Sequence, residues 1–243
     1  MSEKTLYPLE TLSQILNGKL LHAKNEEAAS SISIDSRSLK PGEWFICIQG
    51  EQTDGHLHLE QALENGAAGA VVQPERIPET LLNTTFPQIQ VADPNLALRE
   101  WASFARERFS GKVLGITGSN GKTSTKEILS RLCQRLDKRV DATKGNLNNL
   151  FGVPLTLLGA SPVSPWWVIE MGTNQYGEIS ELSRITKPDG AILTSIAQSH
   201  LEFLKNTQGV AKEKRDIIQG MPPDGALVLP ADLKHLEMIR KHT

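Results

Sequence analysis

A glycine-rich turn between an apolar stretch and a helix-like stretch constrains this chain more than any other feature. Residues 113–127 read Val-Leu-Gly-Ile-Thr-Gly-Ser-Asn-Gly-Lys-Thr-Ser-Thr-Lys-Glu, which predicts a buried strand, a turn and an amphipathic helix in that order. Such a turn points successive backbone N–H groups, and the positive end of the helix dipole, at a bound phosphate. We therefore predict a phosphate-binding loop at residues 117–123.

Separate roles are expected for the residues of this loop. Gly118 and Gly121 allow close backbone approach, Lys122 can carry charge to the β- and γ-phosphates of ATP, and the Thr123 hydroxyl can join a Mg²⁺ ion. The predicted ATP-binding residues are Thr117, Gly118, Ser119, Asn120, Gly121, Lys122 and Thr123. Ile116 stands where the general P-loop pattern has its first glycine, so an ordinary strand-to-helix turn is the alternative.

The remaining pattern predicts two α/β domains, with one large domain as the alternative for 243 residues. Residues 1–90 mix short helices and strands, residues 91–110 form a connecting helix, and residues 111–243 alternate strands and helices in the manner of a parallel sheet. For the first domain the expected helices are 8–17 and 59–65, and the expected strands are 31–34, 44–48, 69–72 and 88–91; the connecting helix is expected at 95–109. For the second domain the expected strands are 112–117, 166–171, 190–196 and 226–229, and the expected helices are 123–136, 177–185 and 209–218.

Composition restricts the location and the partners. The 26 basic residues nearly balance the 28 acidic ones, which argues against a dominant nucleic-acid or anionic-membrane surface. Only Cys47 and Cys133 occur, so we expect reduced, buried thiols and no disulfide framework. The N-terminus lacks a secretory pattern and no apolar run approaches about 18 residues, so we expect a cytoplasmic protein without membrane insertion.

Four further segments accompany the loop variant Thr-Gly-Ser-Asn-Gly-Lys-Thr. They are Ile-Asp-Ser-Arg-Ser-Leu-Lys-Pro-Gly-Glu-Trp-Phe from residue 34, Thr-Lys-Gly-Asn-Leu-Asn-Asn-Leu-Phe-Gly-Val-Pro from 143, Val-Ile-Glu-Met-Gly-Thr-Asn-Gln-Tyr-Gly-Glu-Ile from 168, and Ala-Ile-Leu-Thr-Ser-Ile-Ala-Gln-Ser-His-Leu-Glu from 191. Together they resemble the Mur ligase family, the cytoplasmic enzymes that assemble the peptide of bacterial cell-wall precursors. The resemblance implies an ATP- and Mg²⁺-dependent amide ligase, expected to be a monomer, with UDP-N-acetylmuramoyl-tripeptide and D-alanyl-D-alanine as substrates.

The resemblance also implies substrate-binding residues. Ser36 and Arg37 would contact the uridine-nucleotide end of the substrate in the N-terminal domain, although a capped surface turn explains them equally well. Asn146, Asn148 and Asn149 would bind amide and carboxylate groups, since an asparagine side chain both donates and accepts hydrogen bonds. Taken alone, these asparagines are typical turn residues.

Metal-binding and catalytic residues are implied at the ends of the strands that follow. Glu170 ends an apolar strand, and the carboxyl ends of parallel strands face the ligand crevice, so Glu170 fits the family's magnesium ligand and His200 fits the second. Related ligases carbamylate a lysine in the next segment, and spacing favours Lys214 as the catalytic lysine beside Lys122. A solvated basic helix face around Lys214 is the alternative.

In the resembled family, a substrate carboxylate attacks the γ-phosphate of ATP, and an amine then attacks the acyl phosphate. This chain stops at Thr243, whereas family members continue, so we expect an incomplete central domain and no C-terminal domain. Pro230 also departs from the usual asparagine-alanine-aspartate sequence, which affects the expected adenine contact. Two other hypotheses remain open: a different P-loop enzyme, such as a small-molecule kinase or a folate-type polyglutamate ligase, and a non-catalytic nucleotide-binding fragment.

Overall fold

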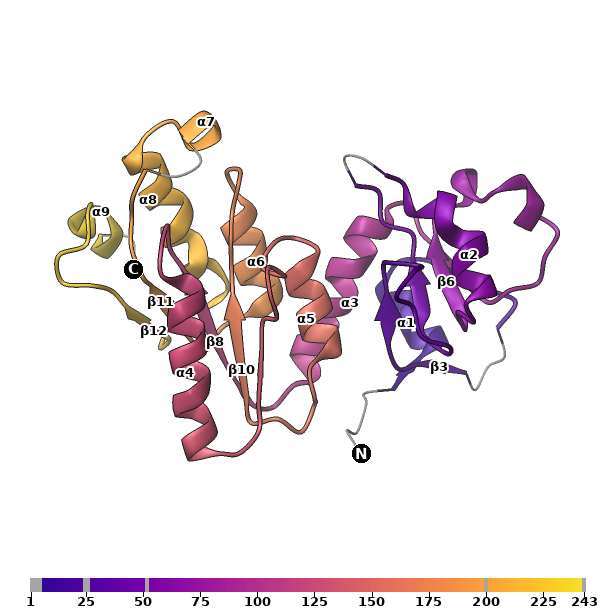
Figure 1. Cartoon of the computed structure of the whole chain (residues 1–243), viewed down its shortest axis with the longest axis horizontal. Coiled ribbons are helices and arrows are strands. Elements are labelled where there is room, and N and C mark those ends of the chain that lie inside the picture. The colour runs from indigo at the N-terminus through magenta and orange to yellow at the C-terminus, as the bar shows by residue number, and fades with distance from the viewer. Residues whose placement is uncertain (1–5, 24–26, 51–52, 199–200, 242–243) are drawn as a thin grey trace. The chain divides into compact units, whose positions relative to one another are not determined.

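The computed structural model describes residues 6–23, 27–50, 53–198 and 201–241, with the side chains of residues 201 and 202 left out. The chain divides into two compact units, Met1–Phe104 and Ala105–Thr243, which are coloured indigo to magenta and magenta to yellow in Figure 1. Both units combine helices with a sheet that is mainly or wholly parallel, which confirms the predicted α/β class.

Unit 1 contains a five-stranded sheet with the strand order β2-β7-β6-β5-β4. Four strands are parallel, and β2 runs antiparallel along β7. The sheet strands are β2 (Lys19–Leu21), β4 (Ile32–Ser33), β5 (Trp44–Ile46), β6 (Gly69–Val72) and β7 (Gln88–Gln90), and a separate antiparallel pair joins β1 (Tyr7–Pro8) to β3 (Ala28–Ala29). The helices of unit 1 are α1 (Leu9–Ile15) and α2 (Leu59–Glu64), and α3 (Pro94–Arg108) begins in unit 1 and ends in unit 2. The short 3₁₀ turns are η1 (Gly55–His58), η2 (Pro74–Arg76) and η3 (Glu79–Leu81).

The centre of the unit 1 sheet is buried throughout, which explains the continuous apolar runs of β5 and β6. Leu59 and Ala62 of α2 belong to the same apolar cluster as Phe45 of β5. Gly69 lies so close to the ring of Trp44 that an added Cβ would come within 2.7 Å of it. The aromatic ring therefore needs a glycine at this position.

Unit 2 contains a second five-stranded sheet, with the order β12-β11-β8-β10-β9 and every pairing parallel. Its strands are β8 (Lys112–Thr117), β9 (Val140–Ala142), β10 (Trp166–Glu170), β11 (Gly190–Leu193) and β12 (Ala226–Val228). Its helices are α4 (Lys122–Leu136), α5 (Gly152–Gly159), α6 (Glu178–Thr186), α7 (Leu201–Leu204), α8 (Thr207–Arg215) and α9 (Leu236–Arg240), together with the 3₁₀ turn η4 (Asp216–Gly220). β8 lies between β10 and β11, so the predicted phosphate loop leaves the middle of the sheet (Figure 1).

Helices cover both faces of the unit 2 sheet. On one face, Cys133 of α4 clusters with Ile116 and Val168 of the neighbouring strands β8 and β10. On the other face, Gly115 of β8 lies near Ile217 of η4, and η4 packs along α6. This arrangement confirms the covered parallel sheet that the alternating pattern predicts.

Several short helices and strands were not predicted from the sequence pattern. The strands β2 and β9 are sheet edges of three residues whose side chains are mostly half-buried, so they lack an apolar run. The helix α5 begins at Gly152 and carries Pro154 in its first turn, where a proline is tolerated because the first N–H groups have no partner within the helix. Cys47 and Cys133 are free and buried, as predicted.

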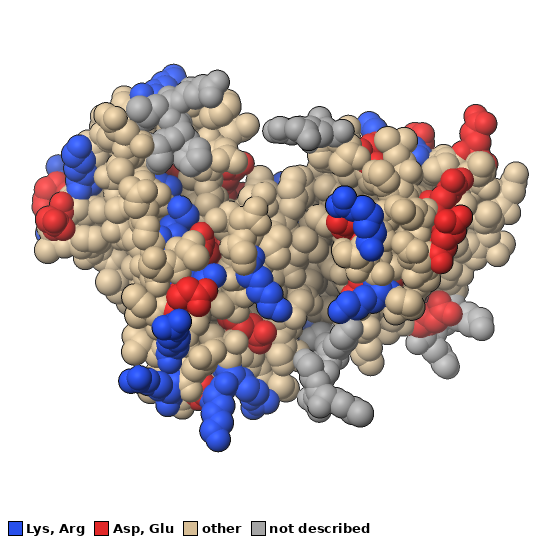
Figure 2. Space-filling model, in the orientation of Figure 1, with Lys and Arg blue, Asp and Glu red and all other residues tan. Residues whose placement is uncertain are grey.

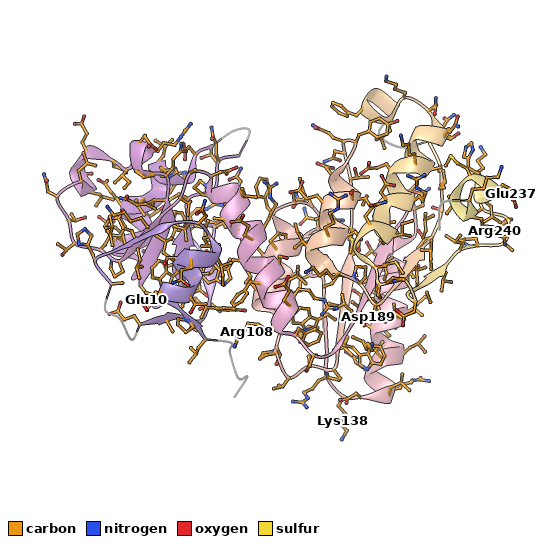
Figure 3. The ribbon with its side chains drawn as sticks, turned by 180° about the vertical axis from the view of Figure 1, so that it is seen from behind. Glu10, Arg108, Lys138, Asp189, Glu237 and Arg240 are labelled. Carbon is orange, nitrogen blue, oxygen red and sulfur yellow. The ribbon has the colours of Figure 1, made fainter. Side chains whose placement is uncertain are left out.

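Charged side chains have two notable arrangements in unit 2. Basic residues gather at the C-terminal end of α4, where Arg135, Lys138 and Arg139 are exposed (Figure 2). Asp189, at the amino end of β11, accepts hydrogen bonds from the Lys112 side chain at 2.8 Å and from the Arg106 side chain at 3.1 Å (Figure 3).

None of the helices in the described part of the chain has both the length and the apolar character that a membrane-spanning helix needs.

Candidate functional site

The loop after β8 has the backbone conformation that its glycines predict. Gly118 and Gly121 have φ values of 153° and 82°, in the region that favours glycine, and α4 begins directly afterwards at Lys122. A Cβ on Gly118 would also collide with the Oγ1 atom of Thr194. The loop therefore depends on glycine at position 118 for both backbone conformation and space.

The segment that follows β11 holds this loop in place. The N–H groups of Ser119 and Asn120 donate to the carbonyl oxygen and the Oγ atom of Ser195, each at 2.9 Å. The Thr194 hydroxyl donates to the carbonyl oxygen of Asn120 at 2.6 Å. Thr194 and Ser195 belong to the segment from residue 191, and the sequence alone assigns them no role. Their hydrogen bonds to the loop after β8 explain why they are polar.

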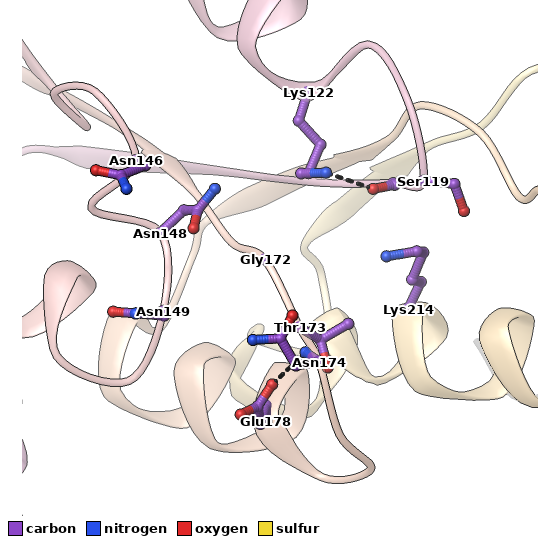
Figure 4. Close-up of a pocket in the computed structure, with 11 residues that line it drawn as sticks. Ser119, Lys122, Asn146, Asn148, Asn149, Gly172, Thr173, Asn174, Glu178 and Lys214 are labelled. Carbon is purple, nitrogen blue, oxygen red and sulfur yellow. Dashed lines mark hydrogen bonds between the residues drawn. The ribbon is translucent and has the colours of Figure 1, made fainter. Parts of the chain in front are cut away.

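The side chains of the loop differ in accessibility. Lys122 Nζ donates to the carbonyl oxygen of Gly118 at 2.9 Å, so the ammonium group lies over the loop (Figure 4). Thr117, which the sequence included among the ATP-binding residues, is the last residue of β8 and is completely buried. Its side chain is therefore not accessible to a ligand in this structure.

Glu170 lies beside the loop, as its position at a strand end predicts. It is only 2% exposed, and its Oε2 atom accepts a hydrogen bond from the Thr123 hydroxyl at 3.0 Å. Oxygen atoms are the ligands that Mg²⁺ prefers, and two oxygens bound at right angles at about 2.1 Å lie about 3.0 Å apart. Glu170 and Thr123 thus place two oxygen atoms of the kind that Mg²⁺ prefers next to each other.

The other expected metal ligand, His200, lies outside the described residues. Among the residues that the structure describes, no group of three or more His, Cys, Asp or Glu side chains could hold a metal ion. A magnesium site here would therefore take few ligands from the described protein and would need oxygens from a bound nucleotide, as is usual for this ion.

The asparagine-rich loop before α5 reaches the same place. Asn148 Nδ2 donates to Glu170 Oε1 at 2.9 Å. Asn149 Oδ1 accepts the N–H groups of Phe151 and Gly152 at 3.1 and 2.8 Å, so it caps the start of α5. Asn146 is exposed on the same loop.

Lys214 faces this site from α8. Its side chain is fully buried, and burial together with the positive charge of Lys122 lowers the pKa of the Lys214 amine to about 8, although the neighbouring Glu213 opposes the shift. The Glu213 carboxylate accepts the N–H groups of Gly177 and Ile179 at 2.7 and 2.8 Å, and so joins α8 to the start of α6. The alternative interpretation, a solvated basic helix face, applies to Lys212, which is exposed, and is wrong for Lys214, which is buried.

A pocket of about 260 Å³ joins these groups (Figure 4). It is lined by Gly118, Ser119, Lys122, Asn146, Asn148, Asn149, Gly172, Thr173, Asn174, Glu178 and Lys214. The structure thus brings the phosphate loop, the three asparagines and Lys214 to one cavity. The sequence did not predict that Thr173, Asn174 and Glu178 line this pocket. The signal available was their position directly after the strand that ends in Glu170.

Unit 1 has a cavity of its own, of about 530 Å³. It is lined by Ile34, Asp35, Ser36, Arg37, Thr53, His58 and Gln61. Ser36 is buried and donates to Gln61 Oε1 at 2.6 Å, whereas the Arg37 side chain is 81% exposed and pairs with Asp35 at 2.7 Å. The Arg37 hydrogen bond lowers the pKa of Asp35 to about 2.

Comparison with known proteins connects both units to one family. The protein-family model described as "Mur ligase family, catalytic domain" matches residues 29–106. The protein-family model described as "Mur ligase middle domain" matches residues 116–243. The second match alone covers more than half of the chain. The chain belongs to the Mur ligase family.

Several curated relatives of this Mur ligase chain are named UDP-N-acetylmuramoyl-tripeptide–D-alanyl-D-alanine ligase. The relative from Escherichia coli is 37% identical over 92% of this chain and 48% of its own length, and the relative from Bacillus subtilis is 36% identical over 92% and 48%. A crystal structure of MurF from Acinetobacter baumannii aligns with a TM-score of 0.89 at 32% identity, over 98% of this chain and 51% of that one. The chain thus spans about half the length of the relatives it matches.

A solved structure described as MurF ligase from Thermotoga maritima in complex with ADP is also similar to this Mur ligase chain. It aligns with a TM-score of 0.75 at 30% identity, over 87% of this chain and 47% of that one.

Proposed function

We propose that this Mur ligase chain supplies the nucleotide site and the uridine-substrate site of an ATP-dependent ligase that joins D-alanyl-D-alanine to UDP-N-acetylmuramoyl-tripeptide. One observation carries the proposal: three relatives with that name are 34–37% identical over 92–95% of this chain. The pocket supports it, because it combines a phosphate loop with amide side chains and a buried lysine. The relative in complex with ADP supports ATP as the nucleotide.

The two units would divide the binding of substrates. In unit 2, the triphosphate would be held by the backbone N–H groups of residues 121–123, the helix dipole of α4 and the Lys122 ammonium group. The N–H groups of Ser119 and Asn120 donate to Ser195 and fix the shape of the loop. In unit 1, Ser36 and Arg37 would hold the uridine-nucleotide end of the tripeptide substrate. Arg37 suits a diphosphate because its guanidinium group is exposed and always charged.

Amide-bond formation requires an activated carboxyl group. A carboxylate oxygen of the tripeptide forms a bond to the γ-phosphorus while the bond from that phosphorus to the oxygen of ADP breaks. The amine nitrogen of D-alanyl-D-alanine then bonds to the acyl carbon, phosphate leaves with the electron pair of the broken bond, and the nitrogen loses a proton. Two anions meet in the first step, so neutralising charge is the main requirement of the site.

The residues of this chain would provide that neutralisation and orientation. Lys122 would stabilise the negative charge that moves onto the transferred phosphoryl group. A magnesium ion held by Thr123 and Glu170, with His200 as a further proposed ligand, would add positive charge beside the phosphates. Asn146 would orient substrate amide and carboxylate groups in the pocket, and Asn149, whose Oδ1 atom caps α5, would donate to a carboxylate through its side-chain amide N–H groups.

Lys214 would act from the far wall of the pocket as the carbamylated lysine. A neutral amine is needed to react with CO₂, and a pKa of about 8 leaves an appreciable neutral fraction near neutral pH. The nitrogen of the neutral amine would bond to the carbon of CO₂ and lose a proton, which gives an anionic carbamate in place of a cationic side chain. We further propose that the enzyme is a cytoplasmic monomer.

Phosphate release tests the proposed function. The chain, alone and extended by any natural continuation, would be assayed with ATP, Mg²⁺ and UDP-N-acetylmuramoyl-tripeptide, with or without D-alanyl-D-alanine. We expect sustained phosphate release only when both substrates are present. Phosphate release at the same rate with and without D-alanyl-D-alanine would overturn the proposal. Transfer of the phosphoryl group to a stable product would favour a kinase and would also overturn it.

A further inference from the structure

Asn148 holds one oxygen of the buried Glu170 carboxylate, while Thr123 holds the other. The distances are 2.9 Å from Asn148 Nδ2 to Glu170 Oε1 and 3.0 Å from Thr123 Oγ1 to Glu170 Oε2. We infer that Asn148 is a positioning residue that aims Glu170 at the magnesium ion, and that it is not a contact for the tripeptide or the dipeptide. The inference rests on the metal site of the proposed function.

The position of Asn148 is fixed by its own backbone. Its N–H group donates to the carbonyl oxygen of Asn146 at 2.8 Å, and its carbonyl oxygen accepts the Gly172 N–H group at 2.7 Å. The side-chain amide lies directly over Gly172, where an added Cβ would come within 3.0 Å of Asn148 Oδ1. The absence of a side chain at position 172 therefore gives the amide its place beside Glu170.

The backbone of Glu170 is held equally firmly. Its N–H group donates to Thr143 Oγ1 at 2.9 Å, and the carbonyl oxygen of Thr143 accepts a hydrogen bond from the buried Lys126 Nζ at 2.8 Å. Lys126 belongs to α4, which also carries Thr123. One network thus joins the helix after the phosphate loop, the end of β10 and the asparagine-rich loop.

A neutral amide suits this role better than a cation would. An arginine or lysine beside Glu170 would neutralise the carboxylate and compete with a metal ion for it. Asn148 orients the carboxylate by a hydrogen bond and leaves its negative charge available. Each carboxylate oxygen has a second lone-pair direction, so Glu170 can keep the Asn148 hydrogen bond while binding an ion. Groups that orient a metal ligand in this way commonly change metal affinity by about 10- to 100-fold when they are removed.

The two possible roles of Asn148 predict different losses. As a substrate contact, Asn148→Ala would raise the Michaelis constant of the tripeptide or of D-alanyl-D-alanine and leave the response to Mg²⁺ intact. If Asn148 is a positioning residue, Asn148→Ala would reduce the gain in nucleotide affinity that Mg²⁺ gives. It would leave nucleotide affinity without metal, which depends on the loop amides, unchanged. Nucleotide binding alone separates these cases, so the test does not depend on catalytic activity.

Calorimetric titration of the whole chain with a non-hydrolysable ATP analogue, in EDTA and in Mg²⁺, measures that response. We expect Mg²⁺ to raise the affinity of the parent chain for the ATP analogue. In Mg²⁺, Asn148→Ala should bind the analogue about 10-fold more weakly than the parent does, whereas in EDTA the two affinities should be equal. Gly172→Ala should shift the response in the same direction by displacing the amide. Lys144→Ala, an exposed position on the same loop that does not line the pocket, should keep the parent's response.

The affinity in EDTA also reports whether each variant keeps a folded nucleotide site. If Asn148→Ala and Gly172→Ala both keep the full response of the parent, the positioning role is wrong and the metal site stands. If the affinity of the parent chain itself ignores Mg²⁺, the metal site of the proposed function is wrong, and this inference falls with it.

Discussion

Replacing Lys214 by methionine should stabilise the protein at neutral pH. Lys214 is fully buried, and burial, reinforced by the charge of Lys122, lowers the pKa of its amine from 10.5 to about 8. Each pKa unit corresponds to about 1.4 kcal/mol, so charging this amine costs the folded state roughly 3 kcal/mol at pH 7. Methionine has a similar length and no charge, so Lys214→Met should recover much of that free energy.

The dependence on pH provides a second and stricter test. The folded state holds the Lys214 proton less tightly than the unfolded state, so the free energy of unfolding of the parent should rise between about pH 8 and 10.5. The advantage of Lys214→Met should therefore be greatest below pH 8 and should shrink to under about 1 kcal/mol near pH 10.

Urea unfolding followed by tryptophan fluorescence, in bicarbonate-free buffer at several pH values, measures this difference. Trp167 is buried in unit 2 and reports on the unit that contains Lys214. Lys212→Met is the matched control, because Lys212 is exposed on the same helix and its charge is already hydrated. Equal stabilities of the Lys214→Met variant and the parent at pH 7, or a difference that does not narrow towards pH 10, would refute the reasoning.

Three further substitutions test other parts of the site. Lys122→Ala should weaken ATP binding at least 10-fold in calorimetry without changing the circular dichroism spectrum, because the Lys122 ammonium group lines the pocket and donates to the loop carbonyl of Gly118; parent-like affinity would contradict the phosphate-loop assignment. Gly118→Ala should destabilise the protein by roughly 1–3 kcal/mol in urea unfolding, whereas the unobstructed Gly159→Ala should not; equal effects would refute the strain argument. Arg37→Ala should weaken binding of the uridine substrate and leave ATP affinity unchanged, and the reverse pattern would contradict the division between the units.

Much of the fold follows from local pattern. The strands β8 and β10 are long apolar runs in the middle of a covered sheet, where burial on both faces forces continuous apolar sequence. The position of Glu170 beside Thr123 also follows, because the carboxyl ends of neighbouring parallel strands meet at one edge of the sheet. Edge strands such as β9 lack that signal, since one side of the strand is unpaired and its residues are half-buried.

The contacts across the site could not be predicted from the sequence. Ser195 follows β11 and binds the loop after β8, and no periodicity reports a hydrogen bond between residues 75 positions apart. Glu213 reads as a surface charge within a basic helix, yet it is buried because the first N–H groups of α6 need an acceptor. Hydrogen bonds of this kind depend on which segments the fold brings together, and local sequence patterns do not contain that information.

Mass analysis of the product tests the proposed ligase most directly. UDP-N-acetylmuramoyl-tripeptide would be incubated with ATP, Mg²⁺, D-alanyl-D-alanine and this protein, including any natural continuation, and the reaction would be followed by mass spectrometry. The proposed function predicts the tripeptide substrate extended by D-alanyl-D-alanine through a new amide bond, with one ADP and one phosphate for each bond and no product from Lys122→Ala. ATP hydrolysis without that product, or the same yield from Lys122→Ala, would contradict it.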